Sequence, residues 1–179
     1  MAPVSAALLR LPSSPAHRHN MRGKPAKKTI TAPDPVFGNR QLTKLINRSM
    51  LDGKKSIAQA QVYRALDIIK EKMKETNPIQ VFESAISQIT PKVEVRSRRV
   101  GGASYQVPSP VRGSRAFSLS IRWLVNEARK RPNKEFHTYA DKLAAELMAA
   151  AKGEGAAVAK KISMHRQAEA NRAFSHFKF

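Results

Sequence analysis

Apolar residues recur at helical spacing along most of this chain of 179 residues, and one stretch between residues 93 and 110 breaks the pattern. There the apolar period changes from about 3.6 residues to two, on either side of the double glycine in RSRRVGGASYQVP. Two glycines tolerate the positive φ angles that a two-residue hairpin turn requires. The sequence therefore predicts a two-stranded antiparallel β-ribbon within a helical protein.

The turn also fixes the register of this ribbon. Placing Val100 opposite Ala103 brings Arg98 opposite Tyr105 and turns Arg99 to the other face, so both faces carry cations. Because an isolated hairpin is marginal in water, we expect the ribbon to project from the helices and to be held by a binding partner. Arginine beside an exposed aromatic ring suits phosphates and unstacked bases. The alternative is a solvated hairpin whose charges only prevent edge pairing.

Six segments carry the apolar stripe of an amphipathic helix. They cover about residues 42–50, 56–73, 77–89, 117–128, 140–148 and 156 into the 170s. Asn77 and Pro78 suit the N-cap and first turn of the third helix. Ser56 and Gln59 suggest a capping box for the second, and Gly53 a left-handed end for the first. The expected fold is mainly α: a six-helix, bundle-like body with a protruding two-stranded antiparallel β-ribbon.

The charge of the chain points to a polyanionic partner. It holds 33 Lys and Arg against 13 Asp and Glu, a net charge of +20, which exceeds what solubility requires. Residues 92–131 carry +8, whereas residues 132–151 carry −1. We therefore expect a basic surface assembled by folding, with the near-neutral fifth helix as internal scaffold or a protein-facing side. No apolar run approaches the roughly 18 residues of a membrane span, so no membrane partner is expected.

The sequence holds fragments of enzyme motifs but no complete one. GKKS at residues 53–56 lacks the first glycine and the preceding strand of a phosphate-binding loop. GEGAAV at residues 153–158 follows a predicted helix, whereas a dinucleotide fingerprint follows a strand. There is no cysteine, and the five histidines lack the spacing of zinc ligands. We expect no enzyme activity, no cofactor and no metal site.

Six segments, in this order and spacing, resemble the family of bacterial-type ribosomal protein seven of the small subunit. They are PDPVFGN, DGKKSIA, NPIQVFESAI, VEVRSRRVGGASYQVPSPVR, IRWLVNEARKR and HRQAEANRAFSHF, and the resemblance covers about residues 21–179. It implies a structural constituent of the small subunit: a primary rRNA-binding protein that organises assembly of the head, or 3′ major, domain, near the decoding region. The implied partners are small-subunit rRNA, exit-site tRNA and neighbouring small-subunit ribosomal proteins. The implied location is the cytoplasmic ribosome, with an organellar ribosome as the alternative.

The resemblance also implies which residues face RNA. Those expected to bind rRNA are Arg22, Lys24, Lys27, Lys28, Lys54, Lys55, Arg96, Arg112, Arg115, Arg122, Arg129, Lys130, Arg131, Arg166 and Arg172. Those at the ribbon tip, expected near tRNA, are Arg98, Arg99, Gly101, Gly102 and Tyr105.

On this basis the chain divides into three parts. Residues 21–38 form a basic extended arm, and residues 39–179 a single helical RNA-binding domain with the ribbon at about 92–111. Residues 1–20 have no counterpart in the family. They are free of acidic residues, so a genuine extension, a transit peptide and an upstream reading of the start codon all stay open.

Two other classes of nucleic-acid-binding protein remain as alternatives. A DNA-architectural protein also sets a basic β-arm on a helical body, but such arms place an apolar or proline wedge at the tip, where this chain has Gly101 and Gly102. A helix-turn-helix regulator needs two helices joined by a short turn, for which the MLDGKKS junction is a faint match.

Overall fold

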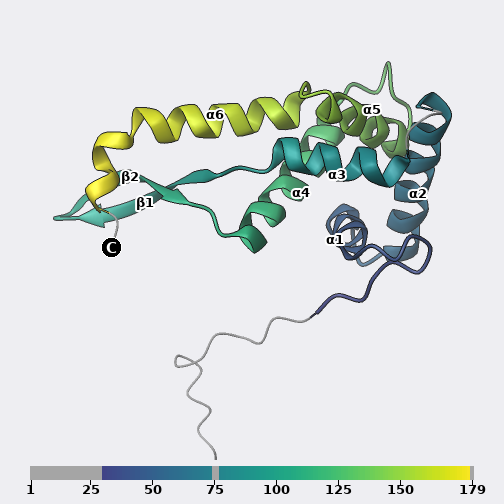
Figure 1. Ribbon diagram of the computed structural model, residues 1–179, viewed down its shortest axis with the longest axis horizontal. Coiled ribbons are helices and arrows are strands. Elements are labelled where there is room, and N and C mark those ends of the chain that lie inside the picture. The colour runs from purple at the N-terminus through teal and green to yellow at the C-terminus, as the bar shows by residue number, and fades with distance from the viewer. Residues whose placement is uncertain (1–29, 74–76, 178–179) are drawn as a thin grey trace, which may run out of the picture. The chain divides into compact units, whose positions relative to one another are not determined.

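The computed structural model describes residues 30–73 and 77–177. The chain divides into Met1–Ile30 and a compact unit, Thr31–Phe179, to which the following refers. Its elements in chain order are α1 (Arg40–Ser49), α2 (Lys55–Lys72), α3 (Pro78–Ile89), β1 (Val93–Val100), β2 (Ala103–Pro110), α4 (Gly113–Lys130), α5 (Tyr139–Ala151), α6 (Ala156–Ala170) and the 3₁₀ helix η1 (Arg172–Phe177) (Figure 1). The predicted mainly α fold with one antiparallel β-ribbon is confirmed. None of the described helices is long and apolar enough to span a bilayer.

Helix α5 forms the centre of the helical body. It contacts α2, α3 and α4, and its side chains Leu143, Ala144 and Leu147 are fully buried. Burying one leucine side chain contributes about 1.5–3 kcal/mol, and the alanines of α5 let the neighbouring helices approach closely. The prediction that the near-neutral fifth helix is internal scaffold is confirmed.

Of the three predicted helix ends, one agrees with the structure and two differ from it. Asn77 caps α3 by accepting a hydrogen bond from the backbone N–H of Ile79, and Pro78 occupies the first turn, as predicted. The predicted left-handed end at Gly53 is wrong, because α1 already ends at Ser49 in an extended residue. Gly53 instead has φ of 74° in the turn before α2. The capping box predicted at Ser56 is also wrong. The N-cap residue of α2 is Lys54, two residues before Ser56, and its side chain makes no capping hydrogen bond.

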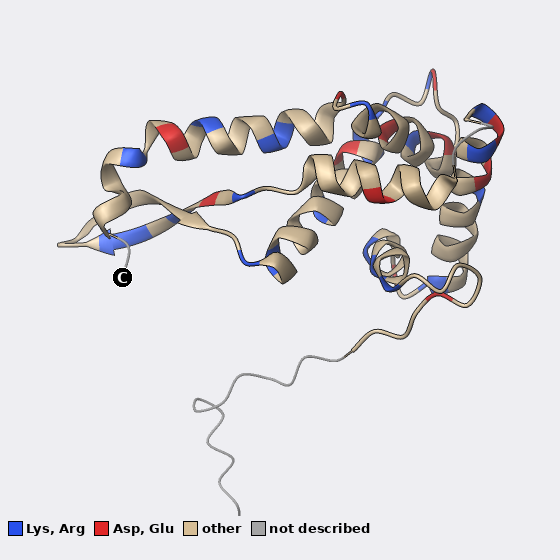
Figure 2. Ribbon diagram, in the orientation of Figure 1, with Lys and Arg blue, Asp and Glu red and all other residues tan. Residues whose placement is uncertain are grey.

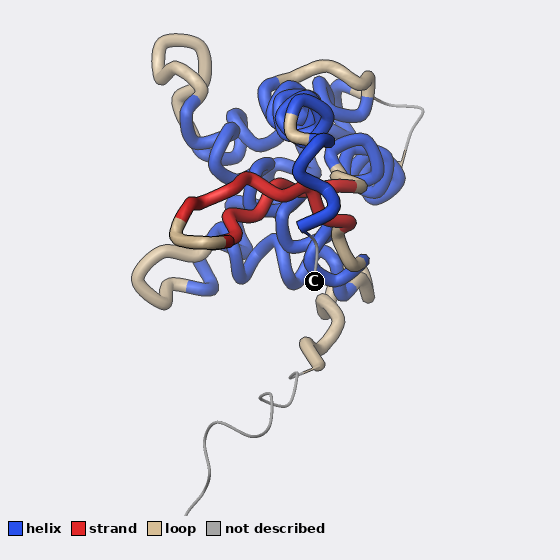
Figure 3. The backbone as a smooth tube through the Cα atoms, turned by 90° about the vertical axis from the view of Figure 1, so that its left-hand side faces the viewer, coloured by secondary structure: helices blue, strands red, loops and turns tan. Residues whose placement is uncertain are grey.

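The ribbon has the predicted register. Val100 pairs with Ala103 and Arg98 with Tyr105, and the two glycines between the strands have φ of 57° and 90°. The strands extend from the helical body, but they are not free-standing. Helix α6 runs beside them, and η1 lies against β2 (Figures 1 and 3). The C-terminal part of the chain therefore supports the ribbon, and the expectation that a binding partner holds it stays a prediction.

Two polar contacts fasten α6 alongside the ribbon. The Nζ of Lys161 donates to the backbone carbonyl of Gln88 at 2.6 Å, at the end of α3. The backbone N–H of Lys92 donates to Nε2 of His165 at 3.2 Å, next to the start of β1. Together they fix the direction of α6 relative to the base of the ribbon.

A buried carboxylate joins α4, α5 and α6. The side chain of Glu146 is fully buried and pairs with Arg131 at 2.8 Å. Its other oxygen accepts the backbone N–H of Ala157, in the first turn of α6, at 2.9 Å. Gly155, between α5 and α6, has φ of 105°, and a Cβ there would lie 3.1 Å from the same oxygen. The glycine thus allows the chain to pass close to the carboxylate.

Candidate nucleic-acid interface

A groove lined by four arginines lies at the base of the ribbon. It has a volume of about 520 Å³, and its walls include Arg96 and Arg98 from β1 and Arg112 and Arg115 from the start of α4. No side chain caps the N-terminus of α4 among the described contacts, so its first backbone N–H groups add to the positive potential. Guanidinium groups at a helix N-terminus are suited to bind phosphate.

Glu94 holds two of these arginines in place. Its side chain is 5% exposed; Nε of Arg115 lies 2.8 Å from each carboxylate oxygen, and Arg96 forms a further ion pair with the same group. Burial alone would raise the pKa of Glu94, but the hydrogen bonds from Arg115 and Arg96 outweigh it and hold this pKa below its ordinary value. Because each guanidinium has five N–H donors, both arginines keep donors for an outside acceptor.

A second basic groove lies between α1 and α4. It has a volume of about 330 Å³ and is lined by Lys44 and Arg48 of α1 and by Phe117 and Arg122 of α4. The ammonium group of Lys44 lies 5.2 Å from the centroid of the Phe117 ring. This groove continues the basic surface along α4 from the ribbon to α1, and Figure 2 shows Lys and Arg on these elements.

Helix α1 contributes a basic face that was not predicted from the sequence. Arg40, Lys44 and Arg48 are exposed and follow one another at intervals of four, which places them on one face of a helix. This signal is present in the sequence, on the side of the helix opposite to the apolar stripe.

At the ribbon tip the described arginines have no ion-pair partner, whereas the aromatic ring packs against other side chains. Arg98 and Arg99 are exposed, and none of the ion pairs in the described part of the chain involves them. The Tyr105 ring is half-buried, with its centroid 5.3 Å from that of Phe174 and 5.0 Å from that of Phe177. The expectation of an exposed ring ready to stack on a base is therefore wrong, because η1 covers it. No signal in the local sequence of the ribbon indicated this contact.

The three cations at the end of α4 all have partners within the protein. Arg129 donates to the backbone carbonyl of Ser49 at 3.0 Å, and Lys130 pairs with Glu127 at 2.8 Å. Arg131 pairs with the buried Glu146 and is 24% exposed. The main role of Arg131 is therefore structural, because it balances the buried charge of Glu146.

The remaining predicted site residues are scattered. Lys54 and Lys55 are exposed at the start of α2, and Arg166 and Arg172 are exposed near the C-terminus. Four others, Arg22, Lys24, Lys27 and Lys28, lie outside the described residues. Within residues 30–73 and 77–177, no group of three or more His, Cys, Asp or Glu side chains could hold a metal ion.

Comparison with known proteins identifies the family. Residues 21–172 match the family model described as ribosomal protein S7p/S5e. The chain is 51% identical over 158 residues to small ribosomal subunit protein uS7 of Carboxydothermus hydrogenoformans, covering 88% of this chain and 99% of the relative. It is 54% identical, with the same coverage, to the proteins of that name from Hahella chejuensis and Marinobacter nauticus. The chain therefore belongs to the ribosomal protein S7p/S5e family.

Proposed function

We propose that this protein, a structural constituent of the small ribosomal subunit, is a primary rRNA-binding protein that organises assembly of the head, or 3′ major, domain. It acts in the cytoplasmic ribosome, near the decoding region and the exit tRNA site. Its partners include neighbouring small-subunit ribosomal proteins. The family is one of structural proteins without enzyme activity, as the sequence analysis expected.

The arginine-lined groove at the base of the ribbon is the observation that carries this proposal. Two of its arginines are held by Glu94, so less side-chain entropy is lost when they bind a phosphate. Arg112, at the N-cap of α4, has no ion-pair partner among the described residues and is free to bind. A positioned set of guanidinium groups fits the closely spaced phosphates of folded RNA.

The distribution of cations favours folded RNA over a straight duplex. The ribbon-base groove, the α1–α4 groove and the exposed lysines at the start of α2 belong to separate elements. Such a spread suits several RNA segments that converge on one protein. Family membership removes the DNA-architectural and helix-turn-helix alternatives.

The ribbon tip is the part we assign to exit-site tRNA. Each strand has eight residues, so the ribbon reaches roughly 27 Å at about 3.4 Å per residue. Arg98 and Arg99 offer free cations there, and Gly101 and Gly102 keep the turn narrow enough to approach an RNA backbone. Tyr105 contributes by anchoring the ribbon to η1.

The rRNA part is tested by binding to a transcript of the 3′ major domain, with duplex DNA at matched salt as competitor. We expect Arg112→Ala to weaken rRNA binding about tenfold or more, since one charge-assisted hydrogen bond contributes about 1.5–3 kcal/mol. Lys134→Ala removes an exposed charge from the near-neutral segment and serves as the matched control. Equal losses in both variants, or equal affinity for duplex DNA, would refute the proposal.

The tRNA part needs reconstituted subunits. The variant Arg99→Ala, which leaves the four arginines of the ribbon-base groove in place, is expected to bind the 3′ major domain with nearly unchanged affinity and to lower the affinity of the subunit for exit-site tRNA. Unchanged tRNA affinity would show that the tip contacts something else.

A further inference from the structure

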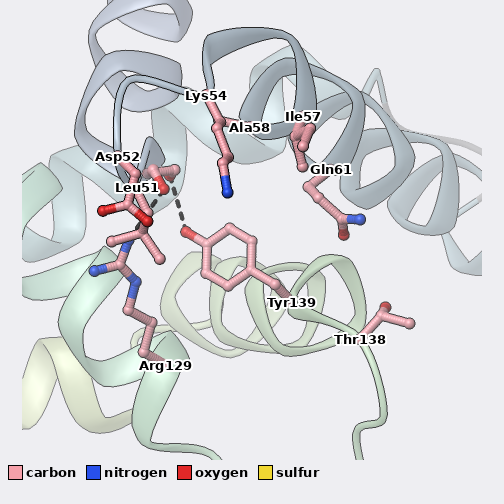
Figure 4. A pocket seen from close by; sticks show the side chains of 10 residues that line it. Leu51, Asp52, Lys54, Ile57, Ala58, Gln61, Arg129, Thr138 and Tyr139 are labelled. Atoms are coloured by element: carbon pink, nitrogen blue, oxygen red, sulfur yellow. Dashed lines mark hydrogen bonds between the residues drawn. The ribbon is translucent and has the colours of Figure 1, made fainter.

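A cavity separate from both basic grooves lies between the turn that follows α1, the first turns of α2, the end of α4 and the start of α5 (Figure 4). Its volume is about 560 Å³, within the range of small-ligand sites. Ala58 and Ile57 of α2 line one side, and Thr138 and Tyr139 line the other. Lys54 and Arg129, which line it, are among the residues expected to bind rRNA, but the proposed function assigns no ligand to the cavity itself.

The wall formed by Tyr139 is rigid. Its hydroxyl group lies 2.9 Å from that of Ser49, and the guanidinium of Arg129 lies 6.0 Å from the ring centroid. Arg129 in turn donates to the backbone carbonyl of Ser49 at 3.0 Å. Burial raises the pKa of the Tyr139 hydroxyl, so the group stays neutral at physiological pH. The aromatic ring is thereby fixed as one side of the cavity.

The rim combines exposed apolar side chains with two charged ones, the ammonium group of Lys54 and the carboxylate of Asp52. Leu51 is 61% exposed and Ile57 is 58% exposed, and both line the cavity. The ammonium group of Lys54 extends toward Tyr139 (Figure 4). Lys54 takes part in no ion pair within the described part of the chain. A ligand that covers this rim would bury apolar surface and neutralise a positive charge at once.

Gln61, which also lines the cavity, carries an acceptor that lacks a donor. Oε1 of Gln61 is buried and accepts no hydrogen bond, the single such side-chain atom among the residues described. An unsatisfied buried acceptor is destabilising. The terminal torsion of a glutamine side chain is soft, so rotation of the amide can present this oxygen to a donor inside the cavity.

We propose that this cavity binds an unpaired RNA base that bears an exocyclic amino group, with the adjoining phosphate on Lys54. The base would lie between Ile57 and the Tyr139 ring, and its amino group would donate to Oε1 of Gln61. An aromatic ring opposite an apolar side chain, with an acceptor on a neighbouring residue, suits a nucleobase, and the unpaired Lys54 suits the phosphate that accompanies it. The inference rests on the proposed rRNA binding and adds a base-specific contact to it.

The first test uses mononucleotides and the full chain. NMR spectra are recorded during titration with CMP, UMP, AMP, IMP and inorganic phosphate. We expect CMP and AMP to shift the signals of Ile57, Thr138 and Tyr139, with affinities about fivefold to tenfold higher than those of UMP and IMP, which carry a carbonyl in place of the amino group. Gln61→Leu should abolish this preference, and Gln61→Glu, which keeps the acceptor, should retain it.

Three outcomes would overturn the proposal: no shift of cavity signals, equal affinities for CMP and UMP, or shifts that phosphate alone reproduces in full. Gln80→Leu, an exposed glutamine on α3, serves as the control for the loss of an amide. The spectra of the variants also show whether each one is folded.

The second test uses the 3′ major-domain transcript and separates this inference from the proposed function. Dimethyl sulfate modifies the base-pairing edge of unpaired adenines and cytosines. We expect one such base to be protected by the wild-type protein and by Ile162→Ser, which alters an exposed isoleucine on α6, but not by Ile57→Ser. If the transcript binds and Ile57→Ser changes no protection, the cavity proposal is wrong while the rRNA function stands. If the transcript does not bind at all, the proposed function fails, and the mononucleotide titration still decides the cavity.

Discussion

The buried carboxylate of Glu146 offers the sharpest test of how the helical body is held together. In the variant Glu146→Ala, the guanidinium of Arg131 and the backbone N–H of Ala157 both lose their acceptor. The ion pair is largely buried, since the Glu146 side chain is fully covered and that of Arg131 is 24% exposed. The variant therefore leaves a partly buried charge and a buried donor without partners.

The magnitude follows from these contacts. Removing one partner of a buried ion pair costs about 3–5 kcal/mol. For a protein of this size, each kcal/mol shifts the Tm by about 2–4 °C, so we expect Glu146→Ala to lower the Tm by about 6–20 °C. Glu146→Gln keeps an acceptor for Ala157 but loses the charge, and it should lose about half as much. Replacing both ion-pair partners, with Arg131→Met and Glu146→Leu, should recover part of the loss because no unpaired charge remains.

Urea and thermal unfolding followed by circular dichroism measure these differences. Glu135→Ala removes an exposed carboxylate from the loop between α4 and α5 and should change stability by less than about 0.5 kcal/mol. A loss below about 1 kcal/mol in Glu146→Ala would refute the reasoning. So would equal stability of the single and the double variant, since the cost would then not come from the unpaired arginine.

Three further predictions concern the connection between α5 and α6 and the support that α6 and η1 give to the ribbon. Gly155→Ala should destabilise the protein by about 1–3 kcal/mol in urea unfolding, because φ is 105° and the new Cβ would meet the buried carboxylate; a neutral result would mean that the loop adapts freely. Phe174→Ala should speed amide hydrogen exchange in the ribbon but not in α5, because it removes packing from Tyr105; uniform exchange rates would contradict this. Burial, and then two neighbouring lysines, lower the pKa of His165, whose neutral ring accepts the N–H of Lys92. The unfolded state therefore takes up the proton first, so this stabilisation is complete above about pH 6.5 and is lost as the pH falls below it. Unfolding at pH 7.5 and pH 5.5 should show a smaller loss in His165→Gln than in the wild type, and identical losses would refute the assignment.

The hairpin and the start of α3 could be predicted from the sequence, because residues within a few positions of each turn or cap determine them. The double glycine predicted both the hairpin and its register, because the turn leaves a single pairing of the two strands. Asn77 and Pro78 predicted the start of α3, because a side-chain cap and a proline act within one turn of the chain. At Gly53 and Ser56 the same kind of signal failed, since the chain turns earlier and α2 begins before the expected cap.

Contacts between distant segments could not be predicted in this way. Tyr105 meets Phe174 about 70 residues later along the chain, and this contact changes its role from a free ring to an anchor. Glu94 meets Arg115 across the ribbon base, so two arginines expected to be free are already positioned by a carboxylate. Neither pairing has a fixed spacing that a sequence pattern reveals. The basic face of α1, by contrast, was readable from the interval between Lys44 and Arg48.

The salt dependence of binding to the 3′ major-domain transcript tests the central claim most directly, which is that the two arginine- and lysine-lined grooves bind rRNA phosphates. The test variant replaces Lys44, Arg112 and Arg122 with alanine, and the matched control replaces Lys70, Lys134 and Lys152, which are exposed elsewhere. Each lost phosphate contact reduces the slope of log K against log salt concentration by about 0.7–0.9. We predict a slope smaller by about 2 to 3 in the test variant and nearly unchanged in the control. Equal changes in the two variants would show that net charge, and not these grooves, determines binding, and would contradict the claim.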